Sequence, residues 1–417
     1  MSPLRTHDVT VTLGDLLRLG VAEALQGDAH VAVTGVHRDS RKVVAGDLFV
    51  ALPGEHVDGS EFAHAAVRAG ACAVLTDSPI AGLAAPQLIA ADVRRGLALA
   101  SHLVYGEPSS ALEVVGITGT NGKTTTSYLL EAILMATGKS VGLIGTVAVR
   151  GPGYTTTSGF TTPEADDLVR YLAQAVDAGA SHLVMEVSSH GLELQRTTGT
   201  RFAVAGFTNL SQDHLDFHPS MEAYGEAKAL LFTEYAPPKS VICVDGAFGA
   251  ALANRAHGDV LRCSVRAESD APLRVLRWSM TRAGLNATLL TPEGEHTLES
   301  PMVGAHNLEN LLVALGCRRG AGVSTTYEQL LGRAARSRHL SLQITHRLRQ
   351  TEWERDNAQD MAAKGRARDQ AQTPNTRRAF RINTMKLAGM TWAEIAKVEG
   401  ITPDYARTLV QNAQRLV

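Results

Sequence analysis

The sequence has few cysteines and no long apolar run, and each absence excludes a class of protein. Its 417 residues include four cysteines, Cys72, Cys243, Cys263 and Cys317, none in a Cys-x-x-Cys pair. This scarcity argues against a disulfide scaffold, so we expect reduced thiols. No stretch approaches the roughly 18 apolar residues of a membrane-spanning helix, and no apolar signal core follows the N-terminus. We therefore expect a cytoplasmic protein without membrane insertion.

The charge is unevenly distributed along the chain. The net charge is −2, but residues 317–417 carry 18 Lys and Arg against nine Asp and Glu, or +9, which leaves −11 on residues 1–316. Such a shift in composition predicts a boundary near Gly316, and the length predicts about three domains. We predict an α/β domain at 1–110, a central domain at 111–316 and a basic, mainly helical segment at 317–417.

The most informative stretch is the glycine-rich turn from Gly116 to Thr126. It joins an apolar strand expected at 112–117 to a helix expected at 125–136. Small residues let backbone N–H groups converge on an anion, Lys123 can reach phosphate oxygens, and the Thr124 hydroxyl can ligate Mg²⁺. The spacing departs from G-x-x-x-x-G-K-[ST] because position 117 is isoleucine. A phosphate cradle is the favoured interpretation, and a chance glycine-rich turn is the alternative.

The first 110 residues have the pattern of a small α/β domain. Strands are expected at 31–34, 47–52 and 73–76, with a helix at 61–69. The polar turn Asp39-Ser40-Arg41-Lys42 lies between the first two strands. Taken alone, it is either a functional loop or an ordinary turn.

The central region alternates strands and helices. Strands are expected at 112–117, 141–145, 182–187, 203–208 and 240–244, which predicts a mostly parallel sheet covered on both faces. Ligands of such sheets bind beyond the carboxyl ends of the strands. Polar residues gather at several of these ends.

Two of these polar groups lie before residue 190. Thr161 and Thr162 could bind an anion, or cap a helix starting near Glu164 with Pro163 at its first position. Glu186 ends an apolar strand, and a buried acid is costly unless it is paired or metal-bound. Glu186 is therefore a candidate Mg²⁺ ligand.

The third group follows the strand at 203–208. The loop 209–218 contains Asp213, His214, Asp216 and His218, which could hold a hard cation or form a solvated loop. The next helix, expected at 221–232, carries Lys228. Considered without its neighbours, a lysine on a helix is predicted to be solvated.

Taken together, these segments closely resemble the MurE-type Mur ligases of peptidoglycan synthesis. These ATP-dependent enzymes add the third amino acid, meso-diaminopimelate or L-lysine, to UDP-N-acetylmuramoyl-L-alanyl-D-glutamate. The resemblance spans about residues 10–316. It rests on Asp39-Ser40-Arg41 with 46–51, the loop 119–125, Thr161-Thr162-Pro163, residues 186–192, residues 207–216, Ala227-Lys228 and His306-Asn307 with Asn310.

The resemblance implies a role for each matching residue. ATP would be bound by Gly119, Thr120, Asn121, Gly122, Lys123, Thr124, Thr125 and Asn310. The UDP-muramoyl-dipeptide would be held by Ser40, with the loop 55–57 beside it, and by Thr161, Thr162, Ser188 and Arg196. Mg²⁺ would be ligated by Thr124, Glu186, His214 and Lys228, the last as a carbamate derived from CO₂. The catalytic group would be Lys123, Glu186, His214 and Lys228.

The resemblance also implies a fold and a reaction. The fold would be α/β, with a small N-terminal uridine-binding domain and a central P-loop-type, mostly parallel sheet domain. A carboxylate of the dipeptide would attack the γ-phosphate of ATP, and the amine of a free amino acid would displace phosphate from the acyl phosphate.

The segment after Gly316 departs from this family. Nothing in it resembles the third, Rossmann-like domain that closes over ATP and binds the incoming amino acid. Residues 391–416 instead resemble a helix-turn-helix, with Gly400 ending the first helix and Pro403 beginning the second. Its positive charge favours DNA, although a solvated helical arm is the alternative. Three hypotheses remain open: an active ligase core, a substrate-binding core joined to a DNA-binding tail, and an incidental fusion.

Overall fold

The computed structural model describes residues 10–54, 58–156, 159–282, 284–321 and 402. All but the last belong to the first of two compact units, residues 1–347. The predicted helix-turn-helix at 391–416 and the loop at 55–57 lie outside the described residues, except for Thr402.

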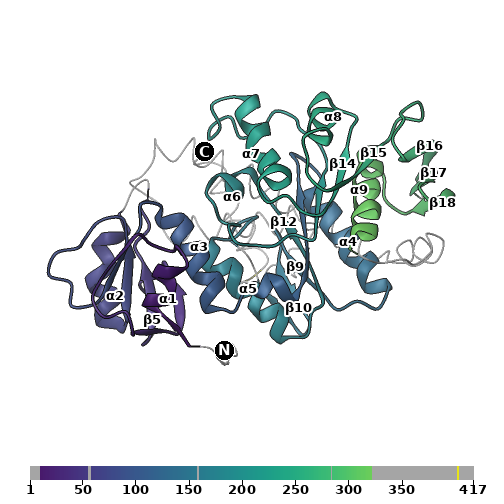
Figure 1. Ribbon diagram of the computed structural model, residues 1–417. Coiled ribbons are helices and arrows are strands. Elements are labelled where there is room, and N and C mark those ends of the chain that lie inside the picture. The colour runs from purple at the N-terminus through teal and green to yellow at the C-terminus, as the bar shows by residue number, and fades with distance from the viewer. Residues whose placement is uncertain (1–9, 55–57, 157–158, 283, 322–401, 403–417) are drawn as a thin grey trace. The chain divides into compact units, whose positions relative to one another are not determined.

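The N-terminal region forms a five-stranded sheet in the order β2-β7-β6-β5-β4. Four strands are parallel and the edge strand β2 is antiparallel. Two further strands form a small ribbon (Figure 1). The elements are β1 (Val11–Thr12), α1 (Leu13–Arg18), β2 (Ala24–Gln26), β3 (Ala32–Val33), β4 (Gly35–His37), β5 (Asp47–Val50), η1 (Gly59–Phe62), α2 (Ala63–Ala69), β6 (Ala73–Thr76), β7 (Gln87–Ile89) and α3 (Val93–Val104).

The side chains of β5 alternate between the two faces of the sheet and so divide its core into two layers. Leu48 and Val50 pack with the residues of α1 and α3, whereas Phe49 packs with Ala63 and Ala66 of α2. Successive side chains of a strand point to opposite faces. This fully buried strand is therefore covered by helices on both sides.

A single-turn helix, η2 (Pro108–Ala111), leads into an eleven-stranded sheet. Its order is β11-β10-β9-β12-β8-β13-β14-β15-β16-β17-β18. The run from β9 to β16 is parallel, and antiparallel strands extend both ends. The strands are β8 (Glu113–Thr118), β9 (Val141–Ile144), β10 (Val149–Gly151), β11 (Tyr154–Thr156), β12 (His182–Glu186), β13 (Val204–Phe207), β14 (Lys239–Cys243), β15 (Asp259–Ser264), β16 (Leu273–Thr281), β17 (Gly284–Thr291) and β18 (Gly294–Ser300).

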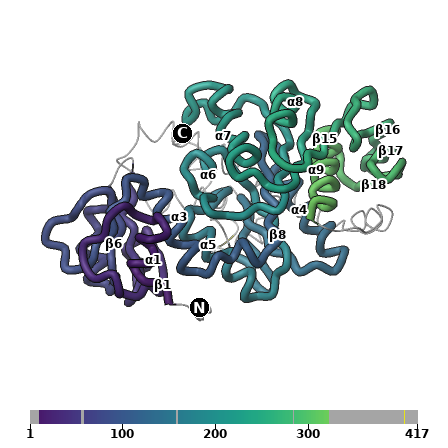
Figure 2. Tube along the Cα trace, viewed as in Figure 1, coloured from purple at the N-terminus to yellow at the C-terminus, as the bar shows by residue number. Residues whose placement is uncertain are grey.

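Helices cover both faces of the parallel part (Figure 2). The pair α4 and α9 packs together on one face, and apolar residues of the other four fill the core on the opposite face. The helices are α4 (Lys123–Ala136), α5 (Ala165–Asp177), α6 (Ser189–Glu193), α7 (Met221–Thr233), α8 (Ala247–Ala253) and α9 (His306–Gly320). Burial on both faces explains the nearly continuous apolar run of β8.

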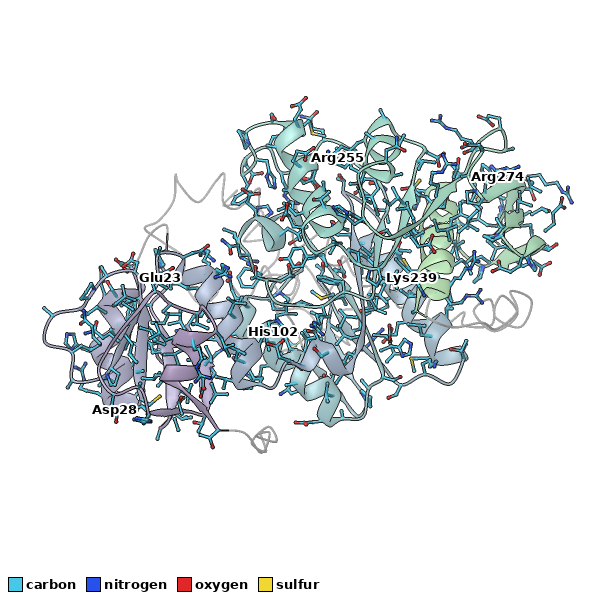
Figure 3. The ribbon with its side chains drawn as sticks, in the orientation of Figure 1. Glu23, Asp28, His102, Lys239, Arg255 and Arg274 are labelled. Carbon is cyan, nitrogen blue, oxygen red and sulfur yellow. The ribbon has the colours of Figure 1, made fainter. Side chains whose placement is uncertain are left out.

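The five strands predicted in the central region are confirmed to within one residue at each end. The helix expected from residue 125 begins at Lys123. The long antiparallel strands β16 to β18 were not predicted; Figure 3 shows Arg274 of this extension and Lys239 at the start of β14. The predicted boundary near Gly316 lies inside α9, because this helix packs on the sheet as far as Gly320.

The four cysteines are free, as expected, with Cys72 half-buried and the other three buried. Within the described ranges, no helix is both long and apolar enough to cross a membrane.

Close approach of α9 to the sheet requires glycine at position 206. A Cβ built on Gly206 would lie 2.8 Å from Ile117 Cδ1, 2.9 Å from Cys317 Sγ and 3.0 Å from Val313 Cγ1. We expect Gly206→Ala to lower the free energy of unfolding by about 1–3 kcal/mol, measured by urea denaturation. Gly159→Ala is the matched control, because φ at Gly159 lies outside the left-handed region and its Cβ would meet nothing within 4 Å. Equal stability of the two variants would contradict this packing argument.

Candidate functional site

The glycine-rich loop lies where β8 ends and α4 begins. Gly119 and Gly122 have φ of +141° and +86°, and a Cβ at either position would come within 2.0 Å of a neighbouring oxygen. Gly122 is the N-cap of α4 and has no side chain that could cap the first turn. The N–H groups of that turn, together with the positive end of the helix dipole, suit an anion.

The segment after β13 fixes the shape of the loop. Thr208 Oγ1 donates to Asn121 O at 2.6 Å, and Asn121 N donates to Asn209 Oδ1 at 3.0 Å. Asn209 Nδ2 in turn donates to Glu309 Oε1 of α9 at 2.8 Å. A chain of hydrogen bonds therefore runs from α9 through Asn209 to the loop. Sequence reasoning gave no role to Thr208 or Glu309, since neither has a distinctive pattern of its own.

Two lysines converge on one carbonyl of the loop. Lys123 Nζ donates to Gly119 O at 3.0 Å and to Thr120 O at 2.9 Å, and Lys228 Nζ donates to Gly119 O at 3.0 Å. Lys228 is 1% exposed and lies over the Tyr224 ring, 4.3 Å from its centroid. The reading of Lys228 as a solvated helix residue is wrong, because α7 presents it to the sheet rather than to water.

Burial, and then the charge of Lys123, hold the pKa of Lys228 well below its ordinary value. The environment therefore favours the neutral amine, which is the nucleophilic form of a lysine.

Glu186, at the carboxyl end of β12, is buried beside the loop. Its carboxylate accepts from Thr124 Oγ1 at 2.9 Å, from Thr146 Oγ1 at 3.0 Å and from Thr146 N at 3.1 Å. Burial raises the pKa of Glu186, although the charge of Lys123 and these hydrogen bonds oppose the shift. A buried carboxylate in contact with a threonine hydroxyl is a donor set that fits Mg²⁺, which prefers oxygen ligands.

His214 lies near both lysines and is partly exposed. Its ring lies 5.0 Å from that of His190 and 5.9 Å from that of Tyr224. Burial lowers the pKa of His214; Asp213 opposes the shift, and the charges of Lys123 and Lys228 add to it. In the part of the chain that the structure describes, no three His, Cys, Asp or Glu residues form a cluster that could hold a metal ion. The structure thus places Thr124 in contact with Glu186, and His214 near Lys123 and Lys228.

The threonines before α5 do not cap that helix. Glu164 is the N-cap, without a side-chain hydrogen bond, and Pro163 precedes it, so the capping interpretation is wrong. Thr162 Oγ1 instead accepts from Ser188 N at 2.9 Å and donates to Glu186 O at 3.0 Å. Thr161 Oγ1 lies 2.9 Å from Thr146 Oγ1.

Arg196 joins the same group of residues. It donates to Thr162 O at 3.1 Å and pairs with Glu164 at 2.7 Å. Thr161, Thr162, Ser188 and Arg196 are therefore linked to the Glu186 side of the loop. Ser40 lies in the turn after β4, in the N-terminal sheet region.

Asn310 supports the loop from the side of α9. It is buried, its Oδ1 accepts from Thr126 Oγ1 at 3.4 Å, and its Nδ2 donates to Asn307 Oδ1 at 3.0 Å. A Cβ on Gly122 would collide with Asn310 Oδ1. Asn310 therefore contacts the loop directly, while the neighbouring Glu309 reaches it through Asn209.

A glycine-rich loop between a central parallel strand and a helix beginning Lys-Thr-Thr defines a class, the phosphate-binding α/β domains. Residues 117–318 match the family model described as the Mur ligase middle domain, and residues 32–102 match that described as the Mur ligase family, catalytic domain. The chain belongs to the Mur ligase family.

Curated relatives of this chain carry the name UDP-N-acetylmuramoyl-L-alanyl-D-glutamate--2,6-diaminopimelate ligase. One from Synechococcus sp. (strain WH7803) is 43% identical over 318 residues, which cover 74% of this chain and 63% of the relative. One from Corynebacterium efficiens is 40% identical over 337 residues, covering 77% of this chain and 64% of the relative. The chain thus spans less than two thirds of the length of these relatives.

Solved structures show the same fold. A structure of UDP-N-acetylmuramoyl-L-alanyl-D-glutamate--2,6-diaminopimelate ligase superposes with a TM-score of 0.69 at 28% identity, covering 79% of this chain and 67% of the other. MurF from Acinetobacter baumannii superposes with a TM-score of 0.60 at 21% identity, covering 80% of this chain and 68% of the other.

The buried amine of Lys228 predicts a specific pH dependence of stability. In the folded protein the pKa of Lys228 is below its ordinary value of 10.5. At pH values between these two pKa values the unfolded chain binds more protons than the folded protein, so stability rises with pH in that range. As the pH rises toward 10.5, wild type should gain more stability than Lys228→Met, by up to about 1.4 kcal/mol per pH unit. The measurement is urea unfolding in carbonate-free buffer.

Lys139→Met, at an exposed position, is the control and should keep the wild-type slope. If Lys228→Met also kept the wild-type slope, Lys228 would titrate normally in the folded protein.

Proposed function

We propose that this chain is the nucleotide- and substrate-binding part of an ATP-dependent ligase that acts on UDP-N-acetylmuramoyl-L-alanyl-D-glutamate. The observation that carries the proposal is the convergence of Lys123, Lys228 and the Thr124–Glu186 pair on one glycine-rich loop. This arrangement suits a triphosphate with a divalent cation. The names of the curated relatives supply the substrate class, and they make 2,6-diaminopimelate the first amino acid to test, with L-lysine second.

The loop would hold the phosphates of ATP through Gly119, Thr120, Asn121, Gly122, Lys123, Thr124 and Thr125, with Asn310 behind it. Lys123 donates to two carbonyls of its own loop. A γ-phosphate would replace these weaker acceptors with a charged one. Lys123 then neutralises charge that builds up as a substrate carboxylate attacks phosphorus.

Thr124, Glu186 and His214 would hold Mg²⁺, with Lys228 as a carbamate supplying a further anionic oxygen. When bound, Mg²⁺ would neutralise phosphate charge and orient the triphosphate. Lys228 is suited to react with CO₂ because its surroundings favour the neutral amine. Conversion of this neutral amine to a carbamate would also place a negative charge beside Lys123.

The muramoyl-peptide end of the substrate would lie against Thr161, Thr162, Ser188 and Arg196, and the UDP end against Ser40. The four residues of the first group are linked to the Glu186 side of the loop by hydrogen bonds. This continuity would bring the dipeptide carboxylate next to the γ-phosphate. Attack would give an acyl phosphate and release ADP, and the amine of the free amino acid would displace phosphate from the acyl phosphate; positioning supplies much of the acceleration.

A second candidate function is substrate binding without ligation. It is favoured by one observation, that the family match ends at residue 318, so nearly all of the +9 segment 317–417 lies beyond it. Incubation with UDP-muramoyl-dipeptide, Mg²⁺, ATP and either amino acid distinguishes the two. Release of ADP together with tripeptide supports ligation, whereas tight binding of both substrates without ADP release supports the binding function.

DNA binding by residues 391–416 stays a separate proposal, based on their helix-turn-helix pattern and on the +9 charge of residues 317–417. Titration of the full chain with duplex DNA at several salt concentrations tests it. Affinity that falls steeply with salt would support it, and the absence of binding at low salt would refute it.

Removal of either lysine should affect a different step. Lys123→Ala should weaken ATP binding in a calorimetric titration, because the loop loses its mobile cation. Lys228→Ala should abolish ligation where wild type is active, and added acetate should restore part of it by supplying a carboxylate. Unchanged ATP affinity in the first variant, or unchanged turnover in the second, would refute the assigned role.

The chain of hydrogen bonds through Asn209 gives a prediction for Glu309. Glu309→Ala removes the acceptor that orients the Asn209 amide, so the dissociation constant of ATP should rise about fivefold, equivalent to about 1 kcal/mol. Glu309→Gln keeps an acceptor oxygen and should retain most of the affinity. Glu299→Ala, at an exposed position of β18, is the control. If the alanine and glutamine variants were equally weakened, charge rather than orientation would be the function of Glu309.

A further inference from the structure

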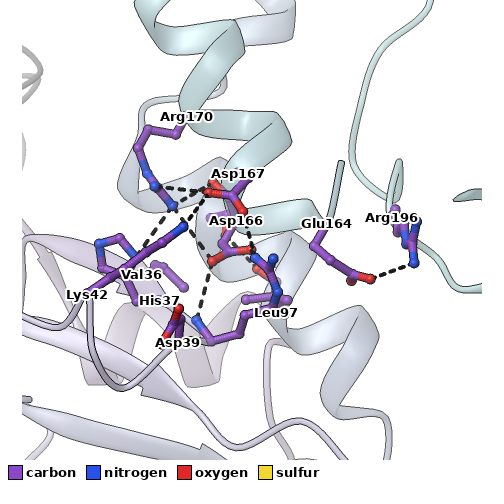
Figure 4. Close-up of polar contacts among 12 residues, drawn as sticks. Val36, His37, Asp39, Lys42, Leu97, Glu164, Asp166, Asp167, Arg170 and Arg196 are labelled. Carbon is purple, nitrogen blue, oxygen red and sulfur yellow. Dashed lines mark hydrogen bonds and ion pairs between the residues drawn. The ribbon is translucent and has the colours of Figure 1, made fainter. Parts of the chain in front are cut away.

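An ion-pair cluster joins the N-terminal sheet region to α5 (Figure 4). Arg38, directly after β4, pairs through Nη1 with Asp166 Oδ1 and with Asp167 Oδ2, the latter at 2.9 Å. The Arg38 backbone N–H also donates to Asp166 Oδ2 at 3.3 Å. Two hydrogen-bond donors of one residue therefore reach the same carboxylate.

Further basic residues complete the cluster. Arg170 Nη1 lies 3.2 Å from Asp167 Oδ1, and Lys42 Nζ lies 3.6 Å from the same oxygen. Burial opposes ionisation of Asp167, but the charges of Arg38, Arg170 and Lys42 outweigh it and lower its pKa. The Asp166 side chain is 1% exposed and that of Arg38 is 22% exposed. Pairs shielded to this degree are screened less by salt than surface pairs.

A second contact lies beside the cluster. Glu164 pairs with Arg94 of α3 at 3.5 Å and with Arg196 at 2.7 Å. Ala165, the first residue of α5, belongs to the apolar core of the N-terminal region. The start of α5 is therefore held to the N-terminal region by both polar and apolar contacts.

The cluster connects the two segments proposed to bind the two ends of the substrate. Arg38 is two residues before Ser40, and Asp166 is four residues after Thr162. The Arg38–Asp166 contact thus fixes the start of one binding segment against the end of the other. A ligand that touches both segments gains affinity only when their separation matches its length.

We propose that Arg38, Asp166 and Asp167 act as positioning residues, forming a clamp that sets the distance between the UDP-binding and the muramoyl-peptide-binding parts of the site. The proposal rests on the proposed function for its ligand. The clamp favours a ligand that contains both ends over UDP alone. Arginine suits this role because its planar guanidinium holds carboxylates in a defined direction, whereas lysine does not.

The first test compares two ligands by calorimetry, UDP and UDP-muramoyl-dipeptide, on wild type and Arg38→Gln. The clamp predicts an unchanged affinity for UDP and an affinity for UDP-muramoyl-dipeptide about tenfold lower in the variant. Arg38→Lys should fall between the two proteins. Arg18→Gln is the control, since Arg18 pairs with Asp15 inside the N-terminal region and its side chain is 73% exposed. Equal weakening of both ligands, or of neither, would overturn the clamp.

The second test needs no ligand, so it separates failure of the clamp from failure of the proposed function. Hydrogen exchange of the peptide covering residues 164–170 is measured in wild type, Arg38→Gln and Arg18→Gln. Loss of the clamp should increase exchange at the start of α5 in Arg38→Gln alone, although the substitution lies on another segment. Unchanged exchange there would refute the clamp. If wild type bound neither ligand while exchange rose as expected, the proposed function would fail and the clamp would stand as a structural contact.

Discussion

Two lysine amines meet at the carbonyl oxygen of Gly119, and the rest of the site is arranged around this pair. Lys123 and Lys228 both donate to that oxygen at 3.0 Å. Two protonated amines this close repel each other, and burial of Lys228 raises the cost of charging it. Glu186, whose carboxylate interacts electrostatically with Lys123, is also engaged by Thr124 and Thr146, so a bound anion would add further negative charge beside the lysines. A triphosphate, a carbamate or both would supply that negative charge.

The loop is held in this conformation from two sides. Thr208 and Asn209 bond to its backbone from the end of β13, and Asn310 packs against Gly122 from α9. Left-handed backbone at Gly119 and Gly122 costs little for glycine, and the neighbouring side chains leave no room for another residue. The conformation of the loop is therefore fixed by the protein's own contacts, and such preorganisation reduces the ordering cost of binding an anion.

Much of the fold could be predicted from sequence because both faces of the parallel sheet are buried. Strands such as β8 are buried over nearly their whole length and have an apolar centre, and the turns between them are marked by polar residues. The hairpins of β16 to β18 were not predicted, because β16 has mixed burial and five exposed residues at its end. A period-2 signal is weak in such a ribbon.

The site was predictable where a residue type has a chemical signature and unpredictable where only tertiary packing decides. Lys123 follows a glycine-rich turn, so its place beside the loop follows from sequence. Burial of Lys228 depends on how α7 packs, and nothing in its local sequence distinguishes it from a surface lysine. The Asn209–Glu309 contact joins residues 100 apart, so no local pattern reveals it.

The two parts of the proposed site, the glycine-rich loop and the UDP-peptide site, depend on different kinds of structure. The residues around the glycine-rich loop come from the ends of neighbouring strands of one sheet and from the helices packed on it, so their geometry follows from the core of one domain. The proposed UDP-peptide site instead combines Ser40 with Thr162 and Arg196, whose separation depends on contacts between two sheets. Polar contacts between a few residues, such as the Arg38–Asp166 pair, are directional, whereas apolar packing alone tolerates small shifts in position. A directional contact at this junction is therefore what a substrate of fixed length would require.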